Sequence, residues 1–211
     1  MPQNKPLQAI RFYGVELSGH AHRVKLFLHM LDLPFETMDV KLDGHYNRSP
    51  EFLAISPFGQ VPAIQDGDVV LHDSNAILVY LASRYGDPSW LPADPVSMAA
   101  VQRWLSLAAG HIFNGPCAAR LVKVFGLDLD YERALQVSQR LLEVIELEFS
   151  GKLFAIGDTP TIADIAAYSY IAHAPEGGVS LEAYSNVRRW LRRVEALDRF
   201  IPMPPSNAAG A

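Results

Sequence analysis

The chain lacks the features that a disulfide-bonded, exported or membrane protein would need. Cys117 is the only cysteine in 211 residues, so neither an intrachain disulfide nor a multi-cysteine metal site can form. Such a chain suits a reducing compartment, and we expect a cytoplasmic protein. Residues 1–5 carry no apolar run typical of a signal peptide, and no stretch approaches the roughly 20 apolar residues of a membrane helix. We therefore expect no membrane partner.

Positive charge is also scarce. Lys and Arg number 18 against 23 Asp and Glu, which gives a formal net charge of -5 at pH 7. Nucleic-acid binding depends on clustered Lys and Arg, so we expect no nucleic acid partner. His22 and His29 lie two turns apart without a carboxylate at ligand spacing, which favours solvated helix positions over a metal site. One basic cluster has the spacing of a solvated helix face: Arg188, Arg189, Arg192 and Arg193.

Residues 1–86 alternate between extended and helical patterns. A short strand is predicted at 9–12, a helix follows through residue 31, and residues 35–41 are extended again. Two apolar segments flank Asp66-Gly67-Asp68 as in a hairpin, and a helix is predicted from Ser74 to residue 85. This order, βαβ, an irregular stretch, then ββα, predicts an α/β domain.

A proline-rich stretch separates this domain from a helical one. Residues 87–95 contain three prolines and no helical period, so they are the expected linker. From residue 96 to 211 we predict an all-α domain, with helices at 96–113, 131–149, 161–174 and 181–197. Thr161 and Asp164 have the spacing of a capping box at a helix start. The tail from residue 202 onward is expected to be frayed.

Two segments of the first domain suggest binding chemistry. In Ser56-Pro57-Phe58-Gly59-Gln60-Val61-Pro62, a proline enters an extended stretch, a place where a cis peptide bond can turn the preceding backbone outward. In Asp73-Ser74, a helix begins, where unpaired N–H groups and the positive end of the dipole favour an anion.

Together with residues 18–25 and 157–164, these segments resemble the glutathione S-transferase family, specifically a serine-type, bacterial-like cytosolic member. The resemblance covers nearly the whole chain. It implies a thioredoxin-like N-terminal α/β domain followed by an all-α domain that completes the electrophile site, and a homodimer. Two positions depart from the family pattern: Ser56 is often asparagine, and Asp73 is more often glutamate or glutamine.

The resemblance implies glutathione as co-substrate and assigns its binding residues. Val61 would pair its backbone with the cysteinyl part, while Pro62 in cis keeps those groups exposed. Asp73 would bind the γ-glutamyl ammonium, and Ser74 with the helix start would bind its carboxylate. A plain helix cap and a trans edge-strand proline are the alternatives. Two side chains are candidates for the glycyl carboxylate: Gln60 and His45.

The required chemistry is activation of a thiol. A free thiol has a pKa of roughly 8.5, so lowering it by about two units makes the thiolate dominant near neutral pH. Ser18 lies between the first strand and the first helix, where its hydroxyl can donate to the thiolate or merely cap the helix. Tyr13 at the strand end is the rival, although it can also be a residue packed at the domain interface. His20 in the first turn could touch the thiol, whereas Cys117 is expected to be a packed small hydrophobe.

The second substrate is expected to be a small hydrophobic electrophile, held between the domains by the helix that begins near Val96. Four side chains could line its pocket or belong to the core: Trp104, Leu107, His111 and Phe113. Three functions stay open: a glutathione transferase, a glutathione-dependent peroxidase or disulfide reductase on the same site, and a non-catalytic binding protein that keeps the fold. The identity of the electrophile does not follow from the sequence.

Overall fold

A computed structural model describes residues 5–206, which form two compact units. One unit contains the residues up to Leu91 together with Asp198–Met203, and the other contains Pro92–Leu197 and the residues from Pro204 onward. The division lies within the expected linker, residues 87–95. The segment Asp198–Met203, which we predicted in the helical domain, belongs to the first unit instead.

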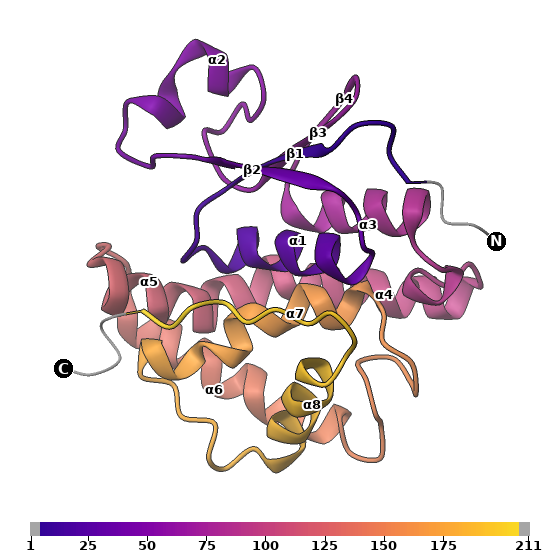
Figure 1. The fold of residues 1–211 in the computed structure, drawn as a ribbon. Coiled ribbons are helices and arrows are strands. Elements are labelled where there is room, and N and C mark those ends of the chain that lie inside the picture. Colours follow the sequence, from indigo (N-terminus) through magenta and orange to yellow (C-terminus); the bar gives the residue numbers. More distant parts are fainter. Residues whose placement is uncertain (1–4, 207–211) are drawn as a thin grey trace. The chain divides into compact units, whose positions relative to one another are not determined.

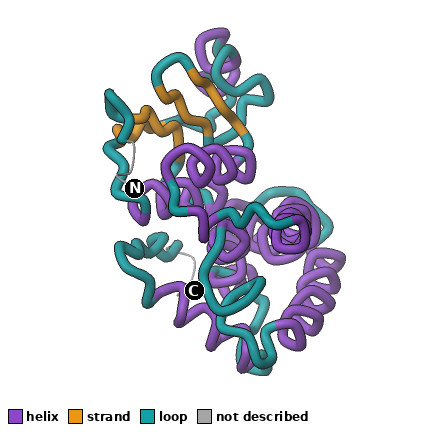
Figure 2. Tube along the Cα trace, turned by 90° about the vertical axis from the view of Figure 1, so that its right-hand side faces the viewer, coloured by secondary structure: helices purple, strands orange, loops and turns teal. Residues whose placement is uncertain are grey.

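The first unit is built on a four-stranded mixed sheet (Figures 1 and 2). Its strands have the order β2-β1-β3-β4, and they are β1 (Ile10–Gly14), β2 (Phe35–Asp39), β3 (Ala63–Asp66) and β4 (Val69–His72). The pair β1–β2 is parallel, and the pairs β1–β3 and β3–β4 are antiparallel. The predicted βαβ order and the predicted hairpin are therefore confirmed.

Helices cover both faces of this sheet, with α1 (Gly19–Met30) and α3 (Ser74–Tyr85) on one face and the short α2 (Pro50–Leu53) on the other (Figure 1). The stretch that we expected to be irregular contains α2 and the 3-10 turn η1 (Tyr46–Arg48). A second 3-10 turn, η2 (Pro88–Trp90), closes the unit. Successive residues of β1 face opposite layers, since Phe12 packs edge to face on Phe35 and Tyr13 packs on Phe52 of α2.

Two histidines of α1 are less exposed than expected. The Nε2 atom of His22 lies 2.9 Å from the carbonyl oxygen of Ile201, in the segment that returns to this unit, and the side chain is buried. His29 is half-buried, with its ring 5.3 Å from that of Phe35. A solvated position was therefore the wrong prediction for His22, whereas His29 keeps partial contact with solvent. Within residues 5–206 no group of three or more metal-binding side chains is found.

The second unit is all-helical. Its elements are α4 (Pro95–Leu107), the π-helical segment η3 (Ala108–Cys117), α5 (Ala118–Phe125), α6 (Tyr131–Glu148), α7 (Ile162–Ala172), the 3-10 turn η4 (Ala174–Gly177) and α8 (Ser185–Glu195). We did not predict α5. Pro116 lacks an N–H group and would break a regular helix, but here it lies inside the wider turns of η3, and the helix continues beyond it.

The core of the second unit surrounds α7, of which almost every residue is buried. The ring of Phe149 is stacked on Trp104 at 5.5 Å and on Trp190 at 4.7 Å. At the start of α7, Thr161 and Asp164 form the predicted capping box. Cys117 is completely buried, as predicted for a packed small side chain.

Helix α8 has a solvated basic face, and part of the segment that follows it is buried. On α8 the residues Val187, Trp190, Leu191 and Val194 are buried, and Arg188, Arg189 and Arg192 are exposed, which confirms a solvated basic face for those three. The frayed tail is wrong for residues 202–206, because Met203 is buried and the backbone N–H of Ser206 donates to Glu176 at 3.0 Å. Residues 207–211 lie outside the described residues. No helix within residues 5–206 is long and apolar enough to cross a membrane.

Candidate functional site

Three strand ends meet at one end of the sheet in the first unit. Because β1 and β4 both run antiparallel to β3, the final residues of β1 and β4 lie beside the first residue of β3. Tyr13 and His72 are both register partners of Ala63. Val61, Ser18 and Asp73 follow or precede these strand ends by a few residues. The topology therefore brings the predicted binding segments to a common end of the sheet.

The peptide that precedes β3 exposes a free backbone edge. The Val61–Pro62 bond is cis, and the Val61 side chain packs against the cluster around Tyr13 and Phe52. Within residues 5–206, no backbone hydrogen bond involves Val61. Its N–H and C=O groups are therefore available to an extended peptide-like ligand.

The loop before Val61 is held in one conformation by buried polar contacts. The hydroxyl of Ser56, which is buried, donates to the carbonyl of Gln60 at 2.8 Å and accepts from the Gln60 N–H at 3.2 Å. The Asn47 amide donates to the carbonyl of Gly59 at 3.2 Å. Gly59 has φ +63° and a Cβ there would clash with the Asn47 backbone oxygen, so this position requires glycine. The side chain of Gln60 remains exposed.

Arg48 lies against the same loop, and sequence reasoning missed it. Its Nη1 donates to the carbonyl of Phe58 at 3.3 Å, which places a guanidinium two residues from Gln60. His45 is exposed, and no hydrogen bond of its ring is found within residues 5–206. In the sequence, Arg48 was visible as a cation just before Ser49-Pro50, where α2 starts. Its position beside the loop that precedes Val61 depends on the turn around Asp43, which the sequence did not predict.

Asp73 both caps α3 and presents a carboxylate to solvent. Its Oδ1 accepts from the N–H groups of Asn75 and Ala76, each at 2.9 Å. The residue is exposed and adopts φ 72° and ψ 118°, a conformation uncommon for any residue except glycine. Since both capping bonds go to Oδ1, capping leaves Oδ2 for another partner.

Ser74 is joined to α1 by two side chains. Its hydroxyl oxygen accepts from Nη1 of Arg23 at 3.2 Å and lies 3.4 Å from Nδ1 of His20. Arg23 also donates to Oδ1 of Asn75 at 3.0 Å. Burial and then the charge of Arg23 lower the pKa of His20 to about 3, so its imidazole is neutral at physiological pH.

Ser18 is the N-cap of α1. Its Oγ accepts from the N–H of Ala21 at 3.3 Å, and the residue is half-buried. A serine hydroxyl that accepts one bond keeps its own hydrogen for donation. The two interpretations of Ser18, cap and hydrogen-bond donor, are therefore compatible in one side chain, and the positive end of α1 adds to its suitability for an anionic sulfur.

Tyr13 lies in a different environment from Ser18. It is 5% exposed and belongs to the core cluster with Val40, Phe52 and Ala63. This burial fits a residue packed at the strand end, and the members of the cluster all belong to the first unit.

The four residues predicted for the electrophile pocket are spread between core and surface of the second unit. Trp104 is completely buried, and its Nε1 donates to the carbonyl of Ala155 at 3.2 Å, so its ring is part of the core and cannot touch a ligand here. Leu107 at the end of α4 is half-buried, and His111 and Phe113 in η3 are exposed.

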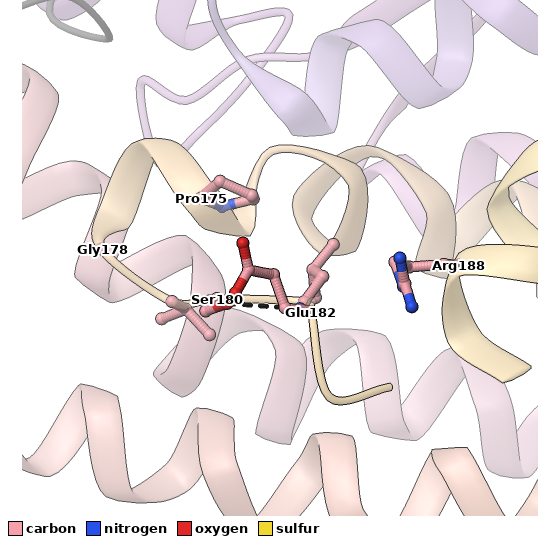
Figure 3. A pocket seen from close by; sticks show the side chains of 7 residues that line it. Pro175, Gly178, Ser180, Glu182 and Arg188 are labelled. Atoms are coloured by element: carbon pink, nitrogen blue, oxygen red, sulfur yellow. Dashed lines mark hydrogen bonds between the residues drawn. The ribbon is translucent and has the colours of Figure 1, made fainter. Parts of the chain in front are cut away.

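A hollow of about 410 Å³ lies elsewhere in the second unit (Figure 3). Its lining comes from η4, the following loop and the start of α8, and consists of Pro175, Gly178, Val179, Ser180, Leu181, Glu182 and Arg188. Both charged side chains are exposed, and none of the predicted site residues lines this hollow.

Comparison with known proteins agrees with the resemblance in both units. Residues 12–89 match the family model described as Glutathione S-transferase, N-terminal domain, and residues 125–198 match that described as Glutathione S-transferase, C-terminal domain. Glutathione S-transferase 3 of Zea mays is 32% identical, covering 96% of this chain and 99% of that protein. Maleylacetoacetate isomerase of Pseudomonas aeruginosa is 30% identical, covering 94% of this chain and 97% of that protein.

Among solved structures, a glutathione transferase homolog from Drosophila mojavensis with bound glutathione is similar in fold. It is 30% identical with a TM-score of 0.79, covering 90% of this chain and 89% of that chain. The predicted fold class, a thioredoxin-like α/β unit followed by an all-α unit, is confirmed by these matches and by the observed elements.

Proposed function

Since this chain belongs to the glutathione S-transferase family, we propose that it activates the thiol of glutathione for attack on a small apolar electrophile. In that reaction the thiol loses its proton, and the thiolate sulfur forms a bond to an electrophilic carbon. The bond from that carbon to its leaving group breaks, and the leaving group takes the electron pair. When the electrophile is an epoxide, a carbon–oxygen bond of the ring breaks and the oxygen keeps the pair.

The site of the first unit offers a partner for each charged or polar part of glutathione. The free N–H and C=O of Val61 suit the cysteinyl backbone, and the Oδ2 atom of Asp73 suits the γ-glutamyl ammonium. Ser74 and the start of α3 suit the γ-glutamyl carboxylate. For the glycyl carboxylate we propose Arg48 with Gln60 in place of His45, because Arg48 is the cation that contacts this loop.

Ser18 is proposed to stabilise the thiolate. A lowering of the thiol pKa by about two units corresponds to roughly 2.7 kcal/mol. One hydrogen bond to a charged acceptor contributes about 1.5–3 kcal/mol, and a helix N-terminus adds roughly 0.3–1 kcal/mol. The single observation that carries this assignment is the Ser18 hydroxyl, which accepts from Ala21 N–H and so keeps its hydrogen for the sulfur.

The test is Ser18→Ala. Glutathione affinity measured by calorimetry should stay nearly unchanged, because Val61, Asp73 and Ser74 hold the tripeptide. The pKa of the bound thiol, followed by thiolate absorbance against pH, should return toward its free value. Turnover at neutral pH should fall roughly 10²–10³-fold, as for loss of one preorganised donor.

Tyr13→Phe is the matched control, since it removes one hydroxyl from a buried ring. It should change neither the thiol pKa nor turnover. If Tyr13→Phe abolishes turnover while Ser18→Ala is silent, the catalytic role belongs to Tyr13. If neither variant has an effect, the assignment of Ser18 is wrong.

Other glutathione-dependent reactions on this site are the second candidate. The similarity to a maleylacetoacetate isomerase adds the isomerisation of maleylacetoacetate to the candidate reactions. The peroxidase and disulfide-reductase alternatives share the same thiol chemistry. Serine at position 18 provides no enzyme thiol for disulfide exchange. A turnover panel of glutathione with haloarenes, epoxides, hydroperoxides, mixed disulfides and maleylacetoacetate separates these reactions. Retention on glutathione-agarose without turnover of any of them would indicate a binding protein.

A further inference from the structure

A buried cation connects the first helix of the site to the start of α3. Arg23 is 0% exposed, although arginine is almost never fully buried without partners. Its Nη1 donates to the hydroxyl of Ser74 and to the side-chain oxygen of Asn75, 51 and 52 residues later in the chain. Ser74 is itself 5% exposed. The Ser74 hydroxyl, which is proposed to bind the γ-glutamyl carboxylate, is therefore hydrogen-bonded to a side chain of α1.

The hydrogen-bonding capacity of a serine hydroxyl is limited to one donated hydrogen and two lone pairs. Arginine can only donate, so Arg23 uses one lone pair of Ser74 Oγ. His20 Nδ1 is the other neighbour, at 3.4 Å. If Nδ1 carries the ring hydrogen, it donates into the second lone pair and the Ser74 hydrogen is left for a ligand. If Nδ1 is unprotonated, the Ser74 hydroxyl donates its hydrogen to Nδ1 and has none left for a ligand.

We infer that Arg23 and His20 are positioning residues that direct the Ser74 hydroxyl toward the γ-glutamyl carboxylate of glutathione. Binding of the glutathione carboxylate selects the tautomer of His20 that carries its hydrogen on Nδ1. In that tautomer the Ser74 hydroxyl donates to the carboxylate, and this hydrogen bond is stronger than the one that the hydroxyl would donate to a neutral imidazole. The low pKa of His20 supports this arrangement, since a neutral ring carries only one hydrogen. This inference rests on the proposed function and adds His20 and Arg23 to it as residues that act through Ser74.

A double-mutant cycle tests the coupling. His20→Ala should raise the dissociation constant of glutathione about tenfold in calorimetry, because the Ser74 hydroxyl is no longer directed at the carboxylate and its hydrogen bond to that charged group is lost. In a Ser74→Ala background the same change should have no further effect. His20→Asn should bind within about twofold of the wild type, because its side-chain amide can donate from the position of Nδ1–H. Equal losses in both backgrounds would overturn the inference.

A truncated ligand identifies the group that the coupling serves. γ-Aminobutyryl-cysteinyl-glycine keeps the ammonium of glutathione and lacks the α-carboxylate beside it. His20→Ala should leave the affinity for this analogue unchanged. A similar loss for both ligands, or a changed thiol pKa with unchanged affinity, would show that His20 acts elsewhere than through Ser74.

The wild-type protein gives a test that does not depend on any variant folding. In long-range ¹H–¹⁵N spectra of the glutathione complex, His20 should have a protonated Nδ1 and an unprotonated Nε2. The opposite tautomer in the complex would refute the inference. Absence of glutathione binding by the wild type would instead refute the proposed function, so the two failures are distinguishable.

Discussion

Replacement of Asp164 by alanine should destabilise the protein far more than loss of an ordinary helix cap. Asp164 is 0% exposed. Its Oδ1 accepts from the Ala155 N–H and from the Trp190 Nε1–H, each at 2.8 Å, and its Oδ2 accepts from the Thr161 N–H at 3.0 Å. The carboxylate thus joins the start of α7, the preceding loop and α8.

The magnitude follows from the donors that Asp164→Ala leaves without an acceptor. Each buried unsatisfied N–H costs about 1–3 kcal/mol, and because such costs are not additive we expect a total of about 3–5 kcal/mol. A helix cap alone is typically worth about 0.5–2 kcal/mol. For a chain of this size the expected fall in Tm is about 6–20 °C, at roughly 2–4 °C per kcal/mol. Asp164→Asn keeps one acceptor oxygen and should lose about half as much.

Urea unfolding monitored by tryptophan fluorescence, together with calorimetry, measures this loss. Asp158→Ala is the matched control, because Asp158 lies in the same loop, is exposed, and should change stability by less than about 0.5 kcal/mol. A loss below about 1 kcal/mol for Asp164→Ala would show that water replaces the carboxylate and that these bonds do not stabilise the fold.

Three further predictions concern binding, pH and assembly. Asp73→Asn keeps the oxygen that caps α3 and removes the charge, so Tm should hold while calorimetry shows a tenfold or greater loss of glutathione affinity, the effect of about 1.5–3 kcal/mol. Burial alone would raise the pKa of Glu176, but bonds from Ser206 N–H, His173 and Arg120 outweigh it and lower the pKa to about 2. Stability from Glu176 is therefore present above its ordinary value of 4.5 and lost as pH falls toward 2, by roughly 3 kcal/mol, and Glu176→Gln should flatten this dependence in acid unfolding curves. The family resemblance predicts a homodimer, so light scattering should give about twice 23.3 kDa, and a monomeric mass at micromolar concentration would count against it.

Features set by neighbouring residues could be predicted from the sequence. The hairpin around Gly67 and the capping box of Thr161 depend on turn and cap chemistry within a few residues, and both are present. The α/β and all-α halves followed from hydrophobic periodicity. The cap at Asp73 was likewise visible as a carboxylate at a helix start, although its role toward a ligand stays a prediction.

Features that depend on distant segments could not be predicted. The contact between Arg23 and Ser74 joins residues 51 positions apart, and the ring of His22 contacts the carbonyl of Ile201, 179 positions later. Trp104 has a helical spacing that suits a pocket and a core equally, and its complete burial and its stacking on Phe149 decide for the core. Arg48 became a candidate once η1 was seen to place it beside Phe58.

The return of Asp198–Met203 to the first unit has a consequence for biosynthesis. The His22 bond to Ile201 spans 179 positions, so α1 cannot obtain this partner until the chain has been synthesised through Ile201. A fragment that stops at Leu91 would therefore leave the imidazole of His22 without its carbonyl acceptor. Contacts of such long range are slow to form, and the first unit should reach its final stability only after Asp198–Met203 has been synthesised and has packed against it.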